Sequence, residues 1–364
     1  MALNCGIIGL TNTGKTTIFN CMSNTKAQSS SYAFSATKSN IGIVDVPDPR
    51  LFKLNDLVHS EKVIPASVEI VDVPGLAKGA SEGEGVGNKF LADLQQTDAL
   101  IHVLRCFDDE NLAHIEGSVD PVRDLEIVDF ELQVRDLDLV ERKLVRLDKL
   151  TKSGDKDAKR GIEALTKYKN HLENFGNART APIEEGDEKY IQDIQLLTNK
   201  AVMYVCNVDD ASAINGNDYV KAVIDYLGKE EQVIVVAGEL EAEISELEDE
   251  NDRIEFLSDA GLEEPGVNRL VRAAYDALNL QSFFTVGPKE IRAWTIKKGM
   301  KAPEASGVIH SDLQRGFIRA EVIKYDDYIQ YGSEPAVKDA GKFHVEGKNY
   351  IVEDGDVMHI RFNV

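Results

Sequence analysis

Residues 9–16 read Gly9-Leu10-Thr11-Asn12-Thr13-Gly14-Lys15-Thr16 and directly follow a short apolar run at residues 3–8. The string has the form G-x-x-x-x-G-K-[ST], and a strand in front of it makes a phosphate-binding loop a stronger assignment than the string alone. A helix starting near Lys15 would aim its first N–H groups, with those of the loop, at one phosphate chain. We therefore predict that Lys15 reaches the β- and γ-phosphates and that the Thr16 hydroxyl binds Mg²⁺. The predicted nucleotide contacts in this stretch are Asn12, Thr13, Gly14, Lys15, Thr16 and Thr17.

Composition and charge limit the possible classes of protein. The chain has 364 residues, of which 43% are hydrophobic, as in ordinary globular proteins. No apolar stretch approaches the roughly 20 residues that cross a bilayer, and the first residues lack the basic start of a secretory signal, so we expect a cytoplasmic protein without a membrane partner. A net charge of −22 argues against nonspecific binding of nucleic acid over a large surface. Residues 281–364 carry 12 Lys/Arg and 12 Asp/Glu, so this least acidic part is the best candidate for meeting RNA.

Apolar runs recur along the first three quarters of the chain and alternate with longer polar or helical stretches. This alternation predicts an α/β fold with a mostly parallel sheet covered by helices. The gap between the fourth and fifth runs is too long for a single crossover, which indicates an insertion. We predict a nucleotide-binding domain over residues 1–125 and 200–280. The runs are residues 3–8, 41–46, 68–71, 99–104, 201–206 and 233–237.

The insertion, predicted over residues 126–199, has apolar residues at spacings of three, four and seven among charged ones. This pattern predicts two antiparallel helices that form a coiled-coil arm, linked by a polar stretch at residues 151–159. A structural or partner-docking role fits it best, and an ordinary pair of domain helices remains open. The apolar positions are Ile127, Phe130, Val134, Leu137, Leu144, Leu147, Leu165, Tyr168, Leu172 and Phe175.

The chain changes character in its last part, residues 281–364. Short strand-like pieces are separated there by glycine turns, which predicts a small separate α+β domain. The predicted strands are residues 291–296, 317–324, 349–352 and 357–362.

A second phosphate-site element is Asp72-Val73-Pro74-Gly75, at the end of the third apolar run. Asp72 can hold the metal, and the Gly75 N–H can sense the γ-phosphate. Many proteins of this architecture have a water-orienting glutamine at the next position, but here it is Leu76, which cannot hydrogen-bond water. Hydrolysis therefore needs another polar group, a partner or a cation. His114, in a polar loop, is the leading catalytic candidate beside Lys15, although a surface histidine without a catalytic role remains open.

Base recognition is expected after the fifth apolar run. Asn207-Val208-Asp209-Asp210 stands where guanine-binding proteins have Asn-Lys-x-Asp, and the lysine is missing. Asp210 could still bond a guanine edge, so the residues alone leave adenine and guanine open. A strand-to-helix turn capped by asparagine and aspartate is compatible with either base.

These segments together resemble the YchF proteins, also called Obg-like ATPases, over nearly the whole chain. The resemblance implies a P-loop NTPase with an Obg-type G domain, an inserted helical arm and a carboxyl-terminal β-grasp TGS domain. It also implies Mg²⁺-dependent hydrolysis of ATP in preference to GTP and association with the ribosome, especially the large subunit, with RNA contact through the TGS domain and the arm. The matching segments include the phosphate loop, residues 72–83, 104–107, His114, 290–295, 317–321 and 354–356.

The resemblance also assigns individual residues. It implies a mobile-loop histidine, matched by His114, and an asparagine associated with K⁺ dependence, matched by Asn12. At the family's switch threonine this chain has Ala36, and Thr37, one place later, is the expected metal ligand. Ala237 and Gly238 stand in the base loop, and Asp210 replaces the usual glutamate. Our hypothesis is a divergent paralogue that binds nucleotide and hydrolyses it slowly; a GTPase, or a nucleotide-gated binding module with little hydrolysis, is the alternative.

Overall fold

The computed structural model describes residues 4–23, 39–73, 86–152, 154–228, 233–247 and 249–363. The chain divides into two compact units, termed here the N-terminal unit (Met1–Gly42 with Glu69–Leu270) and the C-terminal unit (Ile43–Val68 with Val271–Val364). This division differs from the predicted one in three respects. Residues 43–68 and residues 271–280 group with the carboxyl-terminal part of the chain, and the helical insertion belongs to the N-terminal unit.

The N-terminal unit is built on a sheet whose described strands follow the order β2-β4-β1-β5-β6-β7. Strand β1 pairs in parallel with β4 and β5, β5 pairs with β6, and β6 pairs with β7. All seven residues of β5 are buried, as expected for a central strand covered on both faces. Each of the six predicted runs coincides with one of these strands to within one residue at either end, so the predicted α/β architecture is confirmed. The strands are β1 (Asn4–Ile8), β2 (Asn40–Asp45), β4 (Ser67–Asp72), β5 (Ala99–Arg105), β6 (Ala201–Asn207) and β7 (Val233–Val236).

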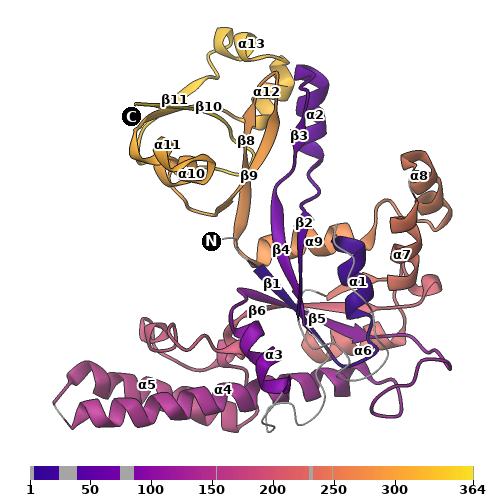
Figure 1. Ribbon diagram of the computed structural model, residues 1–364, viewed down its shortest axis with the longest axis vertical. Helices are drawn as coiled ribbons and strands as arrows, with labels where there is room; N and C mark the ends of the chain where they lie inside the picture. Colours follow the sequence, from indigo (N-terminus) through magenta and orange to yellow (C-terminus); the bar gives the residue numbers. More distant parts are fainter. Residues whose placement is uncertain are drawn as a thin grey trace. The chain divides into compact units, whose positions relative to one another are not determined.

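Helices cover this sheet through two apolar clusters. One cluster joins β1 and β5 to α3 and α4, and the other joins β6 to α6 and α7 (Figure 1). Because β1, β4, β5 and β6 run parallel, their carboxyl ends lie at one edge of the sheet, where α/β proteins bind ligands. The helices are α1 (Lys15–Met22), α3 (Val86–Gln95), α4 (Pro121–Thr151), α6 (Asp218–Leu227), α7 (Gly238–Glu246), α8 (Glu250–Asp259) and α9 (Gly266–Ala277).

Two long helices form the insertion. Helix α4 begins at Pro121, before the predicted start at residue 126, because the Asp120 side chain caps it and proline suits its first turn. Helix α5 (Lys156–Glu173) follows a cap at Asp155 and runs beside α4 (Figure 1). None of the helices in the described ranges has the length and apolar composition needed to span a bilayer.

The predicted apolar seam of the insertion is confirmed in part. Leu165, Tyr168 and Leu172 are buried in one cluster with Val140. Phe130 and Phe175 were predicted to face this seam, but they are 45% and 72% exposed. The buried face of α4 beside Phe130 runs through neighbouring residues instead. The seam residues of α4 that pack against the cluster are Leu137, Leu144 and Leu147.

A buried carboxylate fixes the chain where it returns from the insertion to the sheet. Asp136 of α4 accepts hydrogen bonds from the backbone N–H groups of Leu197 and Thr198, each at 2.7 Å, and from the Thr198 hydroxyl at 2.6 Å. Burial raises the pKa of Asp136 to about 6, against the effect of these bonds. The return segment contains the short turns η1 (Ala178–Thr180), η2 (Asp187–Tyr190) and η3 (Leu197–Asn199).

The C-terminal unit has a mixed sheet with the described order β11-β10-β12-β8-β9-β3. The predicted strand at residues 349–352 is wrong, since that stretch makes only an isolated bridge between Ile351 and Lys301. Strands β3, β8 and β11 were not predicted. The strands are β3 (Val63–Ile64), β8 (Leu280–Val286), β9 (Ile291–Lys297), β10 (Phe317–Ile323), β11 (His344–Glu346) and β12 (Val357–Phe362). The helices are α2 (Pro49–Val58), α10 (Ala302–Ile309), α11 (Ser311–Arg315), α12 (Tyr325–Tyr331) and α13 (Glu334–Asp339).

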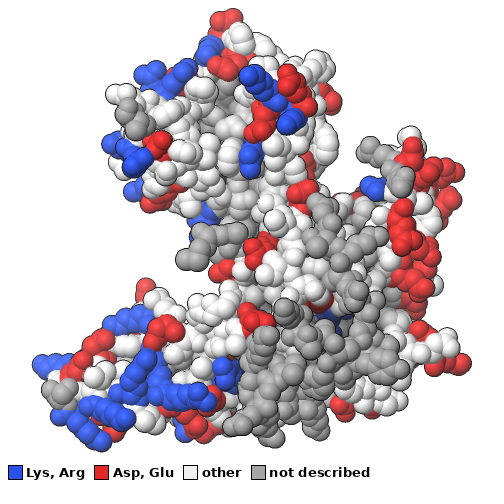
Figure 2. Space-filling view, in the orientation of Figure 1, with Lys and Arg blue, Asp and Glu red and all other residues white. Residues whose placement is uncertain are grey.

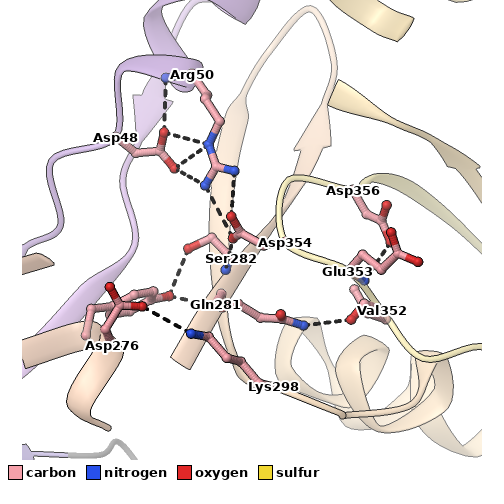
Figure 3. Close-up of polar contacts among 11 residues, drawn as sticks. Asp48, Arg50, Asp276, Gln281, Ser282, Lys298, Val352, Glu353, Asp354 and Asp356 are labelled. Atoms are coloured by element: carbon pink, nitrogen blue, oxygen red, sulfur yellow. Dashed lines mark hydrogen bonds and ion pairs between the residues drawn. The ribbon is translucent and has the colours of Figure 1, made fainter. Parts of the chain in front are cut away.

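Residues 43–68 belong to this unit because strand pairing and charge hold them there. Strand β3 pairs in parallel with β9. Arg50, in the first turn of α2, is held by Asp48 at 2.8 Å and by Asp354 at 2.7 Å (Figure 3). Asp354 also accepts the backbone N–H of Ser282 at 3.0 Å. The arginine therefore joins this early segment to the turn before β12 and to β8.

Candidate nucleotide-binding site

The phosphate loop connects β1 to α1 through an unusual backbone. Gly9 and Gly14 have positive φ angles of 146° and 90°, and Asn12 has a φ of 63°. A Cβ atom at Gly9 would lie 2.4 Å from the carbonyl oxygen of Val103, and one at Gly14 would lie 2.1 Å from the amide nitrogen of Asn207. Both positions therefore require glycine, which lets the loop backbone lie close to its neighbours.

Lys15 begins α1 and is almost fully buried, with 6% of its surface exposed. Its ammonium group donates a hydrogen bond to the carbonyl oxygen of Leu10, which also accepts the Thr13 hydroxyl at 3.1 Å. Burial lowers the pKa of Lys15 to about 8, although Asp72 opposes this shift. A phosphate would replace a neutral carbonyl with an anionic partner for this buried cation.

Asp72 lies at the carboxyl end of β4, beside the phosphate loop. Its Oδ2 accepts the Thr16 hydroxyl at 3.1 Å, and the Asn40 amide lies 3.5 Å from the same oxygen. The other oxygen, Oδ1, is buried and has no hydrogen-bond partner among the residues that the structure describes. Burial raises the pKa of Asp72. A hydroxyl and a carboxylate with a spare oxygen fit Mg²⁺, which prefers hard oxygen ligands.

Asn207, at the end of β6, connects two loops through its side-chain amide. Its nitrogen donates to the carbonyl oxygen of Thr13 at 3.0 Å, and its oxygen accepts the N–H of Gly238 at 2.9 Å. The predicted phosphate and base segments are therefore held together by one buried side chain. Asn207 fixes the position of both loops through their backbones.

The other predicted base residues lie around this connection. Val208 is buried and its N–H donates to the carbonyl oxygen of Val236 at 2.9 Å. Asp210 is exposed at the start of the turn η4 (Asp210–Ser212). Ala237 precedes α7 and Gly238 begins it. Thr17 is half-buried in the first turn of α1.

His114 lies in the loop after β5 but does not face solvent. Its side chain is 3% exposed, and its Nε2 lies 2.8 Å from a carboxylate oxygen of Asp124 in the first turn of α4. Its Nδ1 accepts the N–H of Glu116 at 3.1 Å. The structure thus places the histidine loop beside the phosphate loop, since the Asn12 amide donates to the carbonyl oxygen of Ala113 at 3.0 Å. The imidazole itself is turned toward α4.

Arg105 was not predicted as a site residue, yet it organises the histidine loop. Its guanidinium group is buried at the end of β5 and donates to the carbonyl oxygens of Phe107, Asp109 and Leu112 at 3.1, 3.3 and 2.8 Å. Desolvation lowers its pKa. An arginine as the last residue of an otherwise apolar strand was the signal that could have found it, because a buried charge needs partners.

Two predicted site residues lie outside the described residues. These are Gly75, with the neighbouring Leu76, and Thr37, with Ala36 before it.

Comparison with known proteins matches this geometry to a family. Residues 4–139 match the profile of MMR_HSR1, described as a 50S ribosome-binding GTPase, and residues 280–363 match YchF-GTPase_C, described as a protein of unknown function. A Haemophilus ducreyi protein named Ribosome-binding ATPase YchF is 48% identical over 365 residues, which cover 100% of both chains. The chain belongs to the YchF family. The resemblance predicted from the sequence is thereby confirmed.

Other YchF relatives agree over the full length. A Bacillus subtilis protein of the same name is 46% identical over 367 residues, again covering 100% of both chains. The solved structure of the Schizosaccharomyces pombe YchF GTPase is 32% identical, covers 99% of this chain and 98% of that chain, and superposes with a TM-score of 0.86. This YchF chain therefore has the α/β fold of the P-loop GTPases.

Proposed function

We propose that this YchF protein is a Mg²⁺-dependent nucleoside triphosphatase that prefers ATP, hydrolyses it slowly and acts in the cytoplasm as a ribosome-associated switch. The observation that carries the proposal is the arrangement of Lys15, Thr16 and Asp72. A buried cation, a hydroxyl and a carboxylate with a spare oxygen surround a glycine loop. This combination is costly in a protein that binds nothing there.

The phosphate chain is held by the backbone N–H groups of the loop, by the start of α1 and by Lys15. Thr16 and Asp72, with Thr37 as an expected further ligand, would hold Mg²⁺, which neutralises the charge that develops on the phosphates. Gly75 is the expected contact of the γ-phosphate. Lys15 is counted as catalytic because its charge stabilises the same developing anion.

The attacking water needs an orienting group, and His114 is the proposed one because Leu76 cannot hydrogen-bond water. The Asn12 amide connects the phosphate loop to the residue before His114, which supports this assignment. The same asparagine supports the proposal of K⁺ as a second cation. His114 must leave its partner on α4 before it can act, which is consistent with a slow enzyme.

The base is proposed to lie between the segment of Asn207, Val208 and Asp210 and the segment of Ala237 and Gly238. Asn207 fixes the two segments through their backbones, and Asp210 is exposed and available to a base edge. Relatives are named both ATPases and a GTPase, so a GTPase of the same fold is the first alternative.

The ribosome is the proposed partner, since the curated relatives are named ribosome-binding. Residues 141–170 contain 10 Lys/Arg and 5 Asp/Glu in a chain with a net charge of −22. Lys and Arg gather over the pair of α4 and α5 (Figure 2). We include in the proposal that this pair is a coiled-coil arm, that the C-terminal unit is a β-grasp TGS domain, and that both meet RNA of the large subunit.

A binding experiment tests the proposal. Nucleotide-free protein is titrated calorimetrically with nonhydrolysable ATP and GTP analogues, with Mg²⁺ or with EDTA, and in K⁺ or Na⁺. Tighter ATP binding by about tenfold, or about 1.4 kcal/mol, that is lost in EDTA is the expected result. Tighter GTP binding would make the protein a GTPase, and absence of binding would overturn the nucleotide site.

A second candidate is a nucleotide-gated binding module with little hydrolysis. The retracted His114 and the alanine at position 36 favour it. Turnover of the wild type and of His114→Ala separates the two candidates: an enzyme loses turnover in the variant while keeping its nucleotide affinity. A rise in turnover with Ala36→Thr would mark an impaired switch.

A further inference from the structure

We infer that Asp124 is a positioning residue that holds His114 in a retracted state and so limits the rate of nucleotide hydrolysis. This inference rests on the proposed function of His114. It concerns a different residue, on a different element, because Asp124 belongs to the first turn of α4.

Both ring nitrogens of His114 are engaged in this state. Because Nδ1 accepts the N–H of Glu116, the ring proton lies on Nε2, which donates to Asp124 at 2.8 Å. The two side chains are only 3% and 1% exposed. A neutral imidazole held in this way has no free nitrogen with which to orient a water molecule.

Asp124 is well suited to keep the imidazole in place. Its other oxygen accepts two bonds from the Arg123 guanidinium, at 2.8 and 3.1 Å, so the carboxylate is held from a second side. The bond to His114 involves an ionised acceptor inside the protein, and such bonds are stronger than neutral ones. If the imidazole of His114 moves away from Asp124, it therefore loses a buried, charge-assisted hydrogen bond.

The contacts of Arg105 anchor the part of the loop that precedes His114. Arg105 fixes the carbonyl groups of Phe107, Asp109 and Leu112, so the first part of the loop is anchored. The carbonyl oxygen of Ala113 accepts the Asn12 amide of the phosphate loop at 3.0 Å, and the carbonyl oxygen of His114 accepts the N–H of Gly117 at 3.0 Å. A nucleotide that engages Asn12 would release Ala113 and, with it, the neighbouring His114. The strength of the hydrogen bond to Asp124 then determines how readily the His114 imidazole moves with Ala113.

The experiment compares Asp124→Asn with Asp120→Asn, using the full-length protein and saturating ATP with Mg²⁺. The first variant keeps the shape and an acceptor oxygen but removes the charge. The second alters the cap of the same helix, where Asp120 accepts the N–H of Arg123, without touching His114. We expect Asp124→Asn to raise kcat about fivefold, with nucleotide affinity unchanged within about twofold, because a neutral acceptor binds the imidazole less tightly. Asp120→Asn should keep the wild-type kcat.

His114→Ala and the double variant with Asp124→Asn complete the test. The gain in kcat must disappear when His114 is absent. An unchanged or lower kcat in Asp124→Asn, or an equal gain without His114, would overturn the inference while leaving nucleotide hydrolysis itself intact. Failure of the wild type to bind ATP would instead overturn the proposed function.

Nitrogen NMR of the histidine rings gives a readout that needs no turnover. The signals of His114 are identified by their loss in His114→Ala. In the nucleotide-free wild type we expect a neutral ring with its proton on Nε2, and a protonated Nδ1 would contradict the retracted geometry. In Asp124→Asn the Nε2–H should exchange faster with water, whereas Asp120→Asn should leave it unchanged.

Discussion

Two aspartates, Asp72 in the N-terminal unit and Asp354 in the C-terminal unit, hold their neighbours in different ways. Both oxygens of Asp354 are bonded, to Arg50 and to the N–H of Ser282. One oxygen of Asp72 is buried without a partner among the described residues. A fully paired carboxylate stabilises the fold, whereas a buried carboxylate with a spare oxygen costs free energy until a ligand arrives.

The same difference explains why the size of a cavity does not identify a site. The Arg50 network borders a cavity of about 400 Å³ in the C-terminal unit. The acidic groups at its wall have partners within the unit, as Asp276 has in Lys298 at 3.1 Å (Figure 3). In the N-terminal unit, the site at the phosphate loop has a carboxylate oxygen of Asp72 without a partner among the described residues, and it has the buried ammonium group of Lys15. The chemistry of unpaired groups therefore locates the ligand better than empty volume.

The largest expected effect is the loss of the buried cation. Lys15→Ala should weaken nucleotide binding by about 1000-fold, or about 4 kcal/mol, because the phosphates lose a desolvated positive charge. Calorimetric titration with the ATP analogue and Mg²⁺ measures the change. Arg50→Met, which removes a cation of the C-terminal unit, is the control and should leave affinity unchanged. If Lys15→Ala bound the nucleotide with wild-type affinity, the cation of the N-terminal unit would matter no more for nucleotide binding than that of the C-terminal unit.

The next effect concerns the spare oxygen of Asp72. Asp72→Asn should weaken binding of the Mg²⁺ nucleotide by about 100-fold, or about 2.7 kcal/mol, because a neutral amide is a poor metal ligand. The nucleotide-free variant should unfold at a higher temperature than the wild type, since the buried charge is gone. Calorimetry and thermal unfolding in EDTA measure the two changes. A lower unfolding temperature would mean that the Asp72 carboxylate already stabilises the empty protein.

Glu241 tests whether an unpaired carboxylate oxygen is enough to mark a ligand site. Like Asp72, it has a buried oxygen without a partner among the described residues. Its other oxygen accepts the N–H of Gly266. Burial raises the pKa of Glu241 from 4.5 to about 7, against the effect of backbone hydrogen bonds. If a spare oxygen alone marked a ligand site, Glu241 would be one. We expect it to be only a cost to stability.

The sign of that cost follows from proton binding. Below pH 4.5 Glu241 is protonated in the folded and unfolded chains, so its burial carries no charge penalty. Between pH 4.5 and about 7 the unfolded chain releases its proton while the folded chain still holds it, so the wild type loses stability relative to Glu241→Gln over this range and levels off above it. At pH 8 the variant should be more stable by about 3 kcal/mol, and the difference should vanish below pH 4.5. Urea unfolding across this range measures it, and a constant difference would contradict the assignment.

The local parts of the fold and site could be predicted from the sequence. The phosphate loop is one continuous string of residues that is recognisable from its own spacing of glycines, lysine and threonine. The buried strands are continuous apolar runs that any window of the sequence reveals. These features depend on neighbours in the chain, so the residues specify them without knowledge of the rest.

The remaining features depend on contacts between distant residues. Strand β3 has only two residues, Val63 and Ile64, and is defined by its pairing with β9. The Arg50 to Asp354 contact joins positions 304 residues apart. The retraction of His114 depends on a carboxylate in another element. No periodicity or spacing in the sequence carries such information.

The smallest expected effect comes from the fully paired carboxylate of Asp354. Asp354→Asn should lower the free energy of unfolding by about 1 kcal/mol, because the Arg50 pair is lost but the carboxylate is half exposed and partly screened by solvent. Nucleotide affinity should stay at the wild-type value. Asp276→Asn is the matched control at the same cavity; its pair with Lys298 is more exposed, so its removal should change stability by less than about 0.5 kcal/mol. Opposite signs for Asp72→Asn and Asp354→Asn in the same unfolding experiment would establish that one carboxylate is kept for a ligand and the other for the fold. Equal signs would mean that pairing among the described residues does not distinguish the two roles.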